Sequence, residues 1–177
     1  MNREVVTGLA LMLAPIFLCG GIALAGTGTS TLTAIASVNS NCTIATSGIA
    51  FGSYDPIVTH KTVNLDAIGS ITVACTKGIA PTIALGLGNN AAGNTRRMSS
   101  GTDFLVYELY KPSNNATGTA CSFPGTTVWG NAGANLFSTT TTANKNLRTY
   151  NVCGTAPAGQ NPAVGTYSDT VVATVTF

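Results

Sequence analysis

The sequence predicts an all-β domain of the sandwich or barrel class, and three observations support this. No segment shows a sustained helical period of apolar residues. Apolar and polar residues instead alternate over short runs separated by Gly, Asn, Pro and Ser. Although only 8% of the 177 residues are charged, 45% are apolar, which argues against a disordered chain. The length suits one domain.

The first 25 residues differ from the rest of the chain. An apolar run covers residues 5–18, and Ala23-Leu24-Ala25 fits an A-x-A cleavage site. This pattern predicts a secretory signal peptide over residues 1–25, cleaved between Ala25 and Gly26. A membrane anchor is the alternative, but the run is short for a span and contains Pro15. We therefore expect no membrane span in the mature chain.

Cleavage would remove Cys19 and leave an even number of cysteines, which in an exported chain predicts disulfides. The remaining cysteines are Cys42, Cys75, Cys121 and Cys153. They can pair in three ways. The connectivity Cys42–Cys75 with Cys121–Cys153 is favoured, because each pair encloses a segment that leads from one strand to another. Each bridge would add roughly 3–4 kcal/mol of stability. Zinc binding is disfavoured, because no C-x-x-C spacing occurs and His60 is the single histidine.

The first half of the mature chain reads as a series of short strands. The run 31–38 alternates small apolar and polar residues, and residues 51–56 read as a strand end that enters a proline turn. On the strand 69–75, Ile71, Val73 and Cys75 share one face. The other strands expected here cover residues 41–45, 62–66 and 81–87.

The second half continues the same pattern. A polar tract at 88–102 precedes the run FLVYELY at 104–110, which is the strongest candidate for a buried strand. Loops are expected at 111–120 and 155–164, and a segment of low complexity at 131–146. Shorter strands are expected at 127–129 and 147–153.

The last segment, GTYSDTVVATVTF at 165–177, alternates to the final residue. One face carries Val171, Ala173, Val175 and Phe177, as expected for a half-buried antiparallel strand. An uncovered strand edge at this end of the chain would be prone to pairing with another molecule.

The N-terminal run 31–38 has the pattern of a strand, but the sequence offers no evident partner strand for it. Leu32, Ala34, Ala36 and Val38 fall on one face of this run. Together the two ends suggest strand addition between molecules, which would give a head-to-tail filament. The pattern alone fits equally well a first strand that belongs to a self-contained sandwich.

Several short motifs carry a resemblance to a known family. The C-terminal run is similar to the last strand of chaperone–usher pilins. The rest of the chain resembles the spore coat U domain, the family of archaic chaperone–usher pilins of the Csu type. The motifs stand in family order: NCT at 41–43, FGSYD at 51–55, GSITVACT at 69–76, RM at 97–98, LVYELY at 105–110, WG at 129–130 and PAGQ at 157–160.

This resemblance implies an incomplete immunoglobulin-like Greek-key sandwich, in which the N-terminal segment of the next subunit donates the missing strand. Residues 26–38 would be the donor segment and residues 39–177 the pilin domain. Donor contacts would come from Leu32, Ala34, Ala36 and Val38, and the acceptor groove would be lined partly by Val171, Ala173, Val175 and Phe177. One departure is Cys153-Gly154, where many relatives have an aromatic residue before the glycine.

The implied function is a structural pilus subunit that polymerises by donor-strand exchange, for surface adhesion and biofilm formation. Its partners would be neighbouring pilin subunits, a periplasmic chaperone and an outer-membrane usher. Its place would be the cell surface, reached through the periplasm. Two alternatives remain, a self-contained secreted coat protein and a tip adhesin that binds a surface or a glycan.

No pattern of catalytic residues is evident, so we expect no enzyme, no cofactor and no metal. His60 follows a proline turn in a polar loop and is expected to be solvated, while Asp55 is expected to cap that turn. Tyr107, Tyr110 and Trp129 fit core packing better than a sugar-binding surface. The net charge of +2 and the lack of a basic run disfavour nucleic acid as a partner.

Overall fold

The computed structural model describes residues 25–177, and the chain divides into two units, residues 1–36 and 37–177. In the first unit, the described residues 25–36 form neither helix nor strand. The predicted signal peptide lies outside the described residues except for Ala25. The second unit contains all of the described strands.

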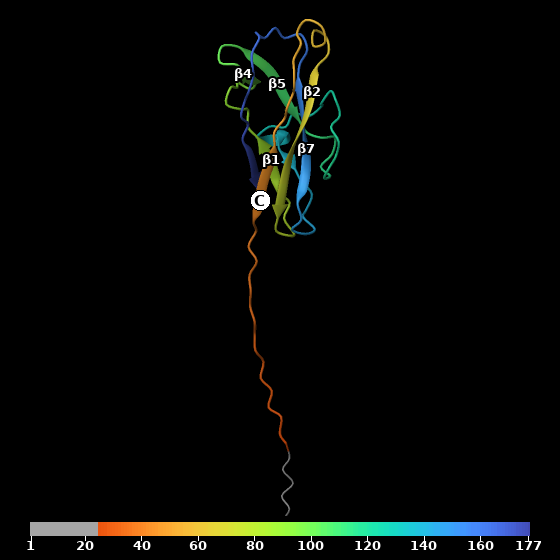
Figure 1. Ribbon diagram of the computed structural model, residues 1–177. Helices are drawn as coiled ribbons and strands as arrows, with labels where there is room; N and C mark the ends of the chain where they lie inside the picture. The colour runs from red at the N-terminus through yellow and green to blue at the C-terminus, as the bar shows by residue number, and fades with distance from the viewer. Residues whose placement is uncertain (1–24) are drawn as a thin grey trace, which may run out of the picture. The chain divides into compact units, whose positions relative to one another are not determined.

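Eight strands and one 3-10 turn make up the second unit (Figure 1). The strands are β1 (Cys42–Ser47), β2 (Leu65–Cys75), β3 (Thr82–Leu85), β4 (Arg96–Ser99), β5 (Phe104–Tyr110), β6 (Phe137–Ser138), β7 (Arg148–Ala156) and β8 (Ala173–Thr176). The 3-10 turn, η1, covers Gly133–Asn135.

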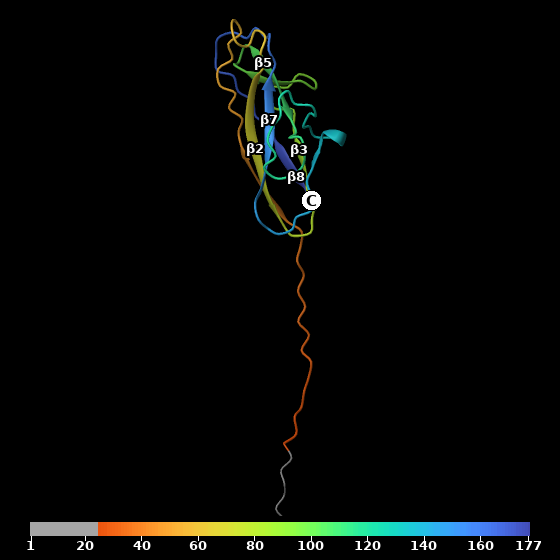
Figure 2. The same cartoon turned by 90° about the vertical axis from the view of Figure 1, so that its right-hand side faces the viewer.

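The strands form two antiparallel sheets, with β3 and β8 in a second layer beside β2 and β7 (Figure 2). The larger sheet has the order β1-β2-β7-β5-β4, and the smaller has the order β6-β3-β8. Strands distant in sequence are neighbours in both sheets, as in an immunoglobulin-like sandwich. The all-β sandwich prediction is confirmed.

The core lies between the two sheets and is centred on Trp129, which is fully buried. Its ring stacks on Phe137 at 4.6 Å, and its indole N–H donates to the Ile83 carbonyl at 3.0 Å. The predicted inner face of β2 is confirmed, because Ile71, Val73 and Cys75 are all buried. Tyr107 is also buried, so it and Trp129 are core residues rather than a sugar-binding surface.

Strand β2 differs from the prediction, which divided it into two strands at residues 67–68. It is one strand of 11 residues, and Gly69 lies within it. A Cβ at this glycine would lie 2.5 Å from Cγ1 of Ile49, so the glycine allows the chain that follows β1 to pass close over the sheet. Glycine is therefore needed here for close packing, and it does not end the strand.

Other predicted strands are shorter or absent. Residues 31–38 and 51–56 form no strand, and residues 127–129 contribute only a bridge between Val128 and Tyr110. The C-terminal strand is limited to β8. The prediction for 104–110 matches β5 residue for residue.

Strand β4 lies in the polar tract at 88–102, where no strand was expected. The sequence gives no sign that Arg96, the first residue of this strand, is buried. Its side chain is 1% exposed and pairs with Glu108. The guanidinium also donates to the carbonyls of Leu85 at 3.1 Å, Gly86 at 2.7 Å and Trp129 at 2.8 Å. A buried guanidinium requires this many acceptors, so Arg96 joins β3, β4, β5 and the Trp129 segment.

Both disulfides follow the pairing that the sequence favoured. Cys42–Cys75 joins the first residue of β1 to the last residue of β2, and Cys121–Cys153 ties the loop after β5 to β7. The first bridge therefore fixes one end of the β1–β2 pair.

We predict that Arg96→Met lowers the free energy of unfolding by about 3–5 kcal/mol, because it leaves the Glu108 carboxylate without its cation. Urea unfolding followed by fluorescence of Trp129, the single tryptophan, would measure the change. Arg97→Met is the matched control, since Arg97 makes one carbonyl bond, to Asn90, and lies over the Phe104 ring. Equal losses in the two variants would contradict the assigned role of Arg96.

Candidate functional site

The candidate site lies between β1 and β8, which are end strands of different sheets. β1 pairs with β2 along one edge, and β8 pairs with β3 along one edge. The two strands run in opposite directions, since the C-terminus lies near the end where β1 begins (Figures 1 and 2). Each therefore presents its other backbone edge at the opening of the sandwich.

A cavity of about 300 Å³ opens into the core at this place. Its rim is formed by the end of β1, by residues 47–49 and by the segment that leads into β8. Its floor is formed by buried apolar side chains from both sheets, namely Ile71, Leu85, Leu109 and Val152. We call this cavity and the two strand edges beside it the β1–β8 groove.

The C-terminal segment crosses from one sheet to the other before it forms a wall of the groove. Ser168 exchanges two backbone hydrogen bonds with Ser99 of β4, at 2.9 and 3.0 Å. Farther along, the Gly86 N–H donates to the Val172 carbonyl at 2.9 Å, and β8 then pairs with β3. One backbone edge of this segment thus pairs first with β4 and then with β3. Its other backbone edge faces the groove.

Asp169 anchors this crossing. Its carboxylate accepts hydrogen bonds from the Tyr107 hydroxyl at 2.7 Å and from the backbone N–H and side-chain amide of Asn90, each at 3.1 Å. Burial raises the pKa of Tyr107 well above its ordinary value, and the Asp169 carboxylate raises it further, so the phenol remains a donor. A side chain at Gly88, where φ is +90°, would collide with this carboxylate.

The structure places the predicted acceptor residues on two kinds of surface. Val171, Ala173 and Val175 are half-buried and pack against the core, and the first two line the cavity. Phe177, predicted on the same face, is 53% exposed because it follows the end of β8. The first three positions thus face inward, as the alternation indicated, and the assignment of all four residues to an acceptor groove stays a prediction.

The predicted donor residues lie outside any strand. Among Leu32, Ala34, Ala36 and Val38, every side chain is exposed, and Leu32 and Val38 are 96% and 85% exposed. Ile35, on the opposite face of the same run, is exposed as well. Large apolar side chains exposed on an extended segment are available for contact with another surface.

Sequence reasoning missed the segment that crosses above the groove. Ile49 and Phe51 pack against the core, and the Phe51 ring contacts Tyr107 edge to face at 5.9 Å. This crossing is possible because the neighbouring strands carry Gly69 and Gly154, whose missing side chains leave room for Ile49. Glycines inside a strand pattern were the available signal, since they mark close approach of another segment.

The expectation of a solvated histidine is wrong. His60 is 7% exposed, stacks on Tyr54 at 4.9 Å between ring centroids, and its Nδ1 lies 2.9 Å from the Val63 carbonyl oxygen. The predicted cap is confirmed, because Oδ1 of Asp55 accepts hydrogen bonds from two backbone N–H groups of the turn. These bonds hold the pKa of Asp55 below its ordinary value.

Neither a metal-ligand cluster nor a candidate membrane helix occurs in the described part of the chain. No group of three His, Cys, Asp or Glu side chains in residues 25–177 is arranged to hold a metal ion. Within the same residues, no helix combines the length and apolar character that crossing a membrane requires.

Residues 28–174 match the Spore Coat Protein U domain family. The chain belongs to this family. Protein U of Myxococcus xanthus is 36% identical over 168 residues, which cover 86% of this chain and 87% of the relative. Membership agrees with the resemblance that the ordered sequence motifs indicated.

The fold of this spore coat protein U domain is shared by a chain of the CsuC–CsuE chaperone–tip adhesion subunit pre-assembly complex of the archaic chaperone-usher Csu pili of Acinetobacter baumannii, with a TM-score of 0.53 and 24% identity. The match covers 79% of this chain and 40% of that chain. A weaker likeness is to HdaB, the minor tip subunit of the E. coli Hda pilus, with 12% identity, a TM-score of 0.37 and coverage of 75% of this chain and 79% of that chain.

We predict that Tyr107→Phe lowers the free energy of unfolding by about 1–3 kcal/mol, because it removes the hydroxyl that binds the Asp169 carboxylate. It should also speed hydrogen exchange at the Asn90 amide, which shares that carboxylate. Tyr110→Phe on the same strand is the control, since the hydroxyl that binds the Asp169 carboxylate is that of Tyr107. Unchanged exchange at Asn90 in Tyr107→Phe would refute the anchoring role of Asp169.

Proposed function

We propose that this protein is a structural subunit of a chaperone–usher type surface fibre, and that the N-terminal segment of another copy fills its β1–β8 groove. The observation that carries the proposal is the open core between two strand edges. An edge of this kind is a template for an added strand. The same chain supplies a candidate for that strand in residues 29–38.

The pattern of residues 29–38 suits insertion between two edges. Side chains at every second position of a strand point to the same side, so Leu32, Ala34, Ala36 and Val38 would all face the floor of the groove. Leu32 and Val38 would each gain about 1.5–3 kcal/mol if fully buried. The added backbone would provide hydrogen bonds to β1 on one side and to β8 on the other. Because Cα atoms of β1 and β8 lie within 8 Å of each other, the two strands would move apart to the spacing of about 9–10 Å that an intervening strand needs.

Assembly by this route requires partners before the fibre forms. A subunit whose two strand edges lack partners is prone to pairing with other chains, so we propose a periplasmic chaperone that covers the groove and an outer-membrane usher that exchanges chaperone for subunit. The Csu structure, in which a chaperone is bound to a tip adhesion subunit, supports the first of these partners. The fibre would stand on the cell surface and serve adhesion and biofilm formation, without a cofactor.

The proposal divides the chain by role. Cleavage between Ala25 and Gly26 would release the mature subunit, residues 26–38 would donate, and residues 39–177 would accept. Repetition of this head-to-tail contact gives an open filament, because each copy uses a different surface to donate and to accept.

A second candidate function, a coat component that folds without donation, is favoured by membership of the Spore Coat Protein U domain family. The two candidates differ in the state of the groove. A coat component that needs no donor would remain monomeric and stable when produced without a chaperone, whereas the fibre subunit would not.

We predict that deletion of residues 29–38 leaves a subunit that binds the chaperone but cannot extend a fibre. The reason is that the deleted chain keeps its groove and loses the strand that fills the next groove. Fibre formation by electron microscopy and chaperone co-purification would measure the two properties separately. Normal fibres from the deleted chain would refute donor-strand exchange.

The complementary change is Ala173→Asp, which places a charge on the half-buried face of β8. We predict that this variant still donates its segment but no longer accepts one, because a carboxylate in an apolar groove loses its hydration. Mixed with the deletion variant, it should give pairs and no longer species, as measured by size-exclusion chromatography with light scattering. Thr174→Asp is the control, since Thr174 faces solvent on the same strand; an equal defect in this control would refute the assignment of the inward face.

A further inference from the structure

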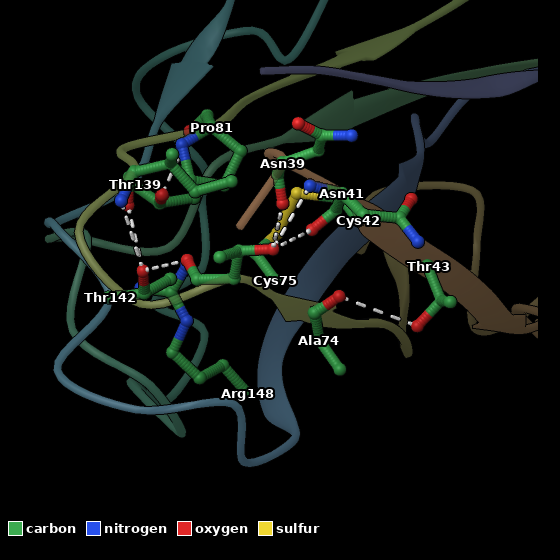
Figure 3. Close-up of a disulfide and its surroundings, with 12 residues drawn as sticks. Asn39, Asn41, Cys42, Thr43, Ala74, Cys75, Pro81, Thr139, Thr142 and Arg148 are labelled. Carbon is green, nitrogen blue, oxygen red and sulfur yellow. Dashed lines mark hydrogen bonds between the residues drawn. A yellow bond between two sulfur atoms is a disulfide. The ribbon is translucent and has the colours of Figure 1, made fainter. Parts of the chain in front are cut away.

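The root of the N-terminal segment, residues 39–41, is held by the side chain of Thr76, directly after β2. The Asn41 N–H donates to Oγ1 of Thr76 at 3.0 Å, and this hydroxyl lies 3.2 Å from the Asn39 carbonyl oxygen. The Thr76 N–H donates to the Asn41 carbonyl at 2.9 Å. Residues 39–41 therefore continue β1 on the side of β2, beside the Cys42–Cys75 disulfide (Figure 3).

Thr76 is itself fixed from the other side. Thr142, which is 2% exposed, donates its hydroxyl to the Thr76 carbonyl at 2.7 Å. The N–H groups of Gly78 and Ile79 in turn donate to the carbonyl and the hydroxyl of Thr142, at 2.9 and 3.2 Å. The neighbouring disulfide adds a covalent link, so Thr76 is well placed to control the direction of the root.

The sequence of the root favours a different conformation. Asn39, Ser40 and Asn41 are residue types that dominate tight turns. A turn here would make a hairpin, in which residues 31–38 run antiparallel to β1 along its free edge. That path leads into the chain's own β1–β8 groove.

Self-insertion of this kind would compete strongly with another copy. Because the segment and the groove belong to one chain, the effective concentration of the segment is on the order of millimolar. A second copy at ordinary concentrations would not displace it. The bonds from Thr76 oppose the turn, because Asn39 and Asn41 would have to give up this hydroxyl to reverse direction.

We propose that Thr76 is a positioning residue that holds the root extended, prevents the chain from filling its own groove and so reserves the groove for a second copy. This inference rests on the proposed function. It adds that Thr76 decides whether the segment inserts into the groove of its own chain or into that of another copy. It assigns a role to residues outside the groove, on the opposite edge of β1.

The test uses Thr76→Val in the full mature chain, with a fluorescent synthetic peptide of residues 29–38 as the probe. The variant should bind the peptide roughly tenfold more weakly than wild type, because loss of the hydroxyl's bonds shifts the root toward the turn by about that factor. It should also remain monomeric where wild type polymerises. Thr43→Val is the matched control, since the Thr43 hydroxyl reaches the Ala74 carbonyl at 3.5 Å and does not touch the root.

A second variant separates self-insertion from damage to the fold. Deletion of residues 29–38 from Thr76→Val should restore peptide binding to the level of the same deletion in wild type, because the competing segment is gone. Binding by Thr76→Val that equals wild type would overturn the role of Thr76, and so would a defect that the deletion does not repair. If the wild-type deletion variant fails to bind the peptide, the proposed function itself falls.

Discussion

The edges of β1 and β8 set the main constraint on this structure. Backbone N–H and C=O groups along a strand need partners, and a cavity that opens into the core leaves the apolar side chains of its floor without packing partners on one side. The strand edges and the cavity both occur at the β1–β8 groove. An added strand meets both at once, because its backbone bonds the edges while alternate side chains cover the floor.

In the proposed assembly the walls of the groove have to stay in place until a strand is added, and the surrounding contacts are suited to this. Arg96 joins both sheets through one buried guanidinium, with Glu108 compensating its charge. Asp169 fixes the crossing of the C-terminal segment through Tyr107 and Asn90. Both are polar networks within an apolar domain, and each fixes the position of a segment more specifically than apolar packing would.

The two edges of β1 have different tasks in the proposed assembly. One edge borders the groove, while the other pairs with β2 and is extended past Cys42 by the bonds to Thr76. Filling the groove and directing the root are thus separate functions of a single strand. The Cys42–Cys75 disulfide lies at the first residue of β1, where the root joins the strand.

The sequence by itself determined the all-β class, the family, β5, the inward face of Val171, Ala173 and Val175 and the favoured disulfide pairs. These features depend on local alternation, on spacing and on the order of short motifs. Tertiary structure alone decided that Gly69 lies within one long strand, that Arg96 and His60 are buried and that Thr76 holds residues 39–41. The physical reason is that each of these depends on a partner distant in sequence, such as Ile49 over Gly69 or Trp129 beside Arg96. Local patterns carry no information about such partners, because they form only when the two sheets pack.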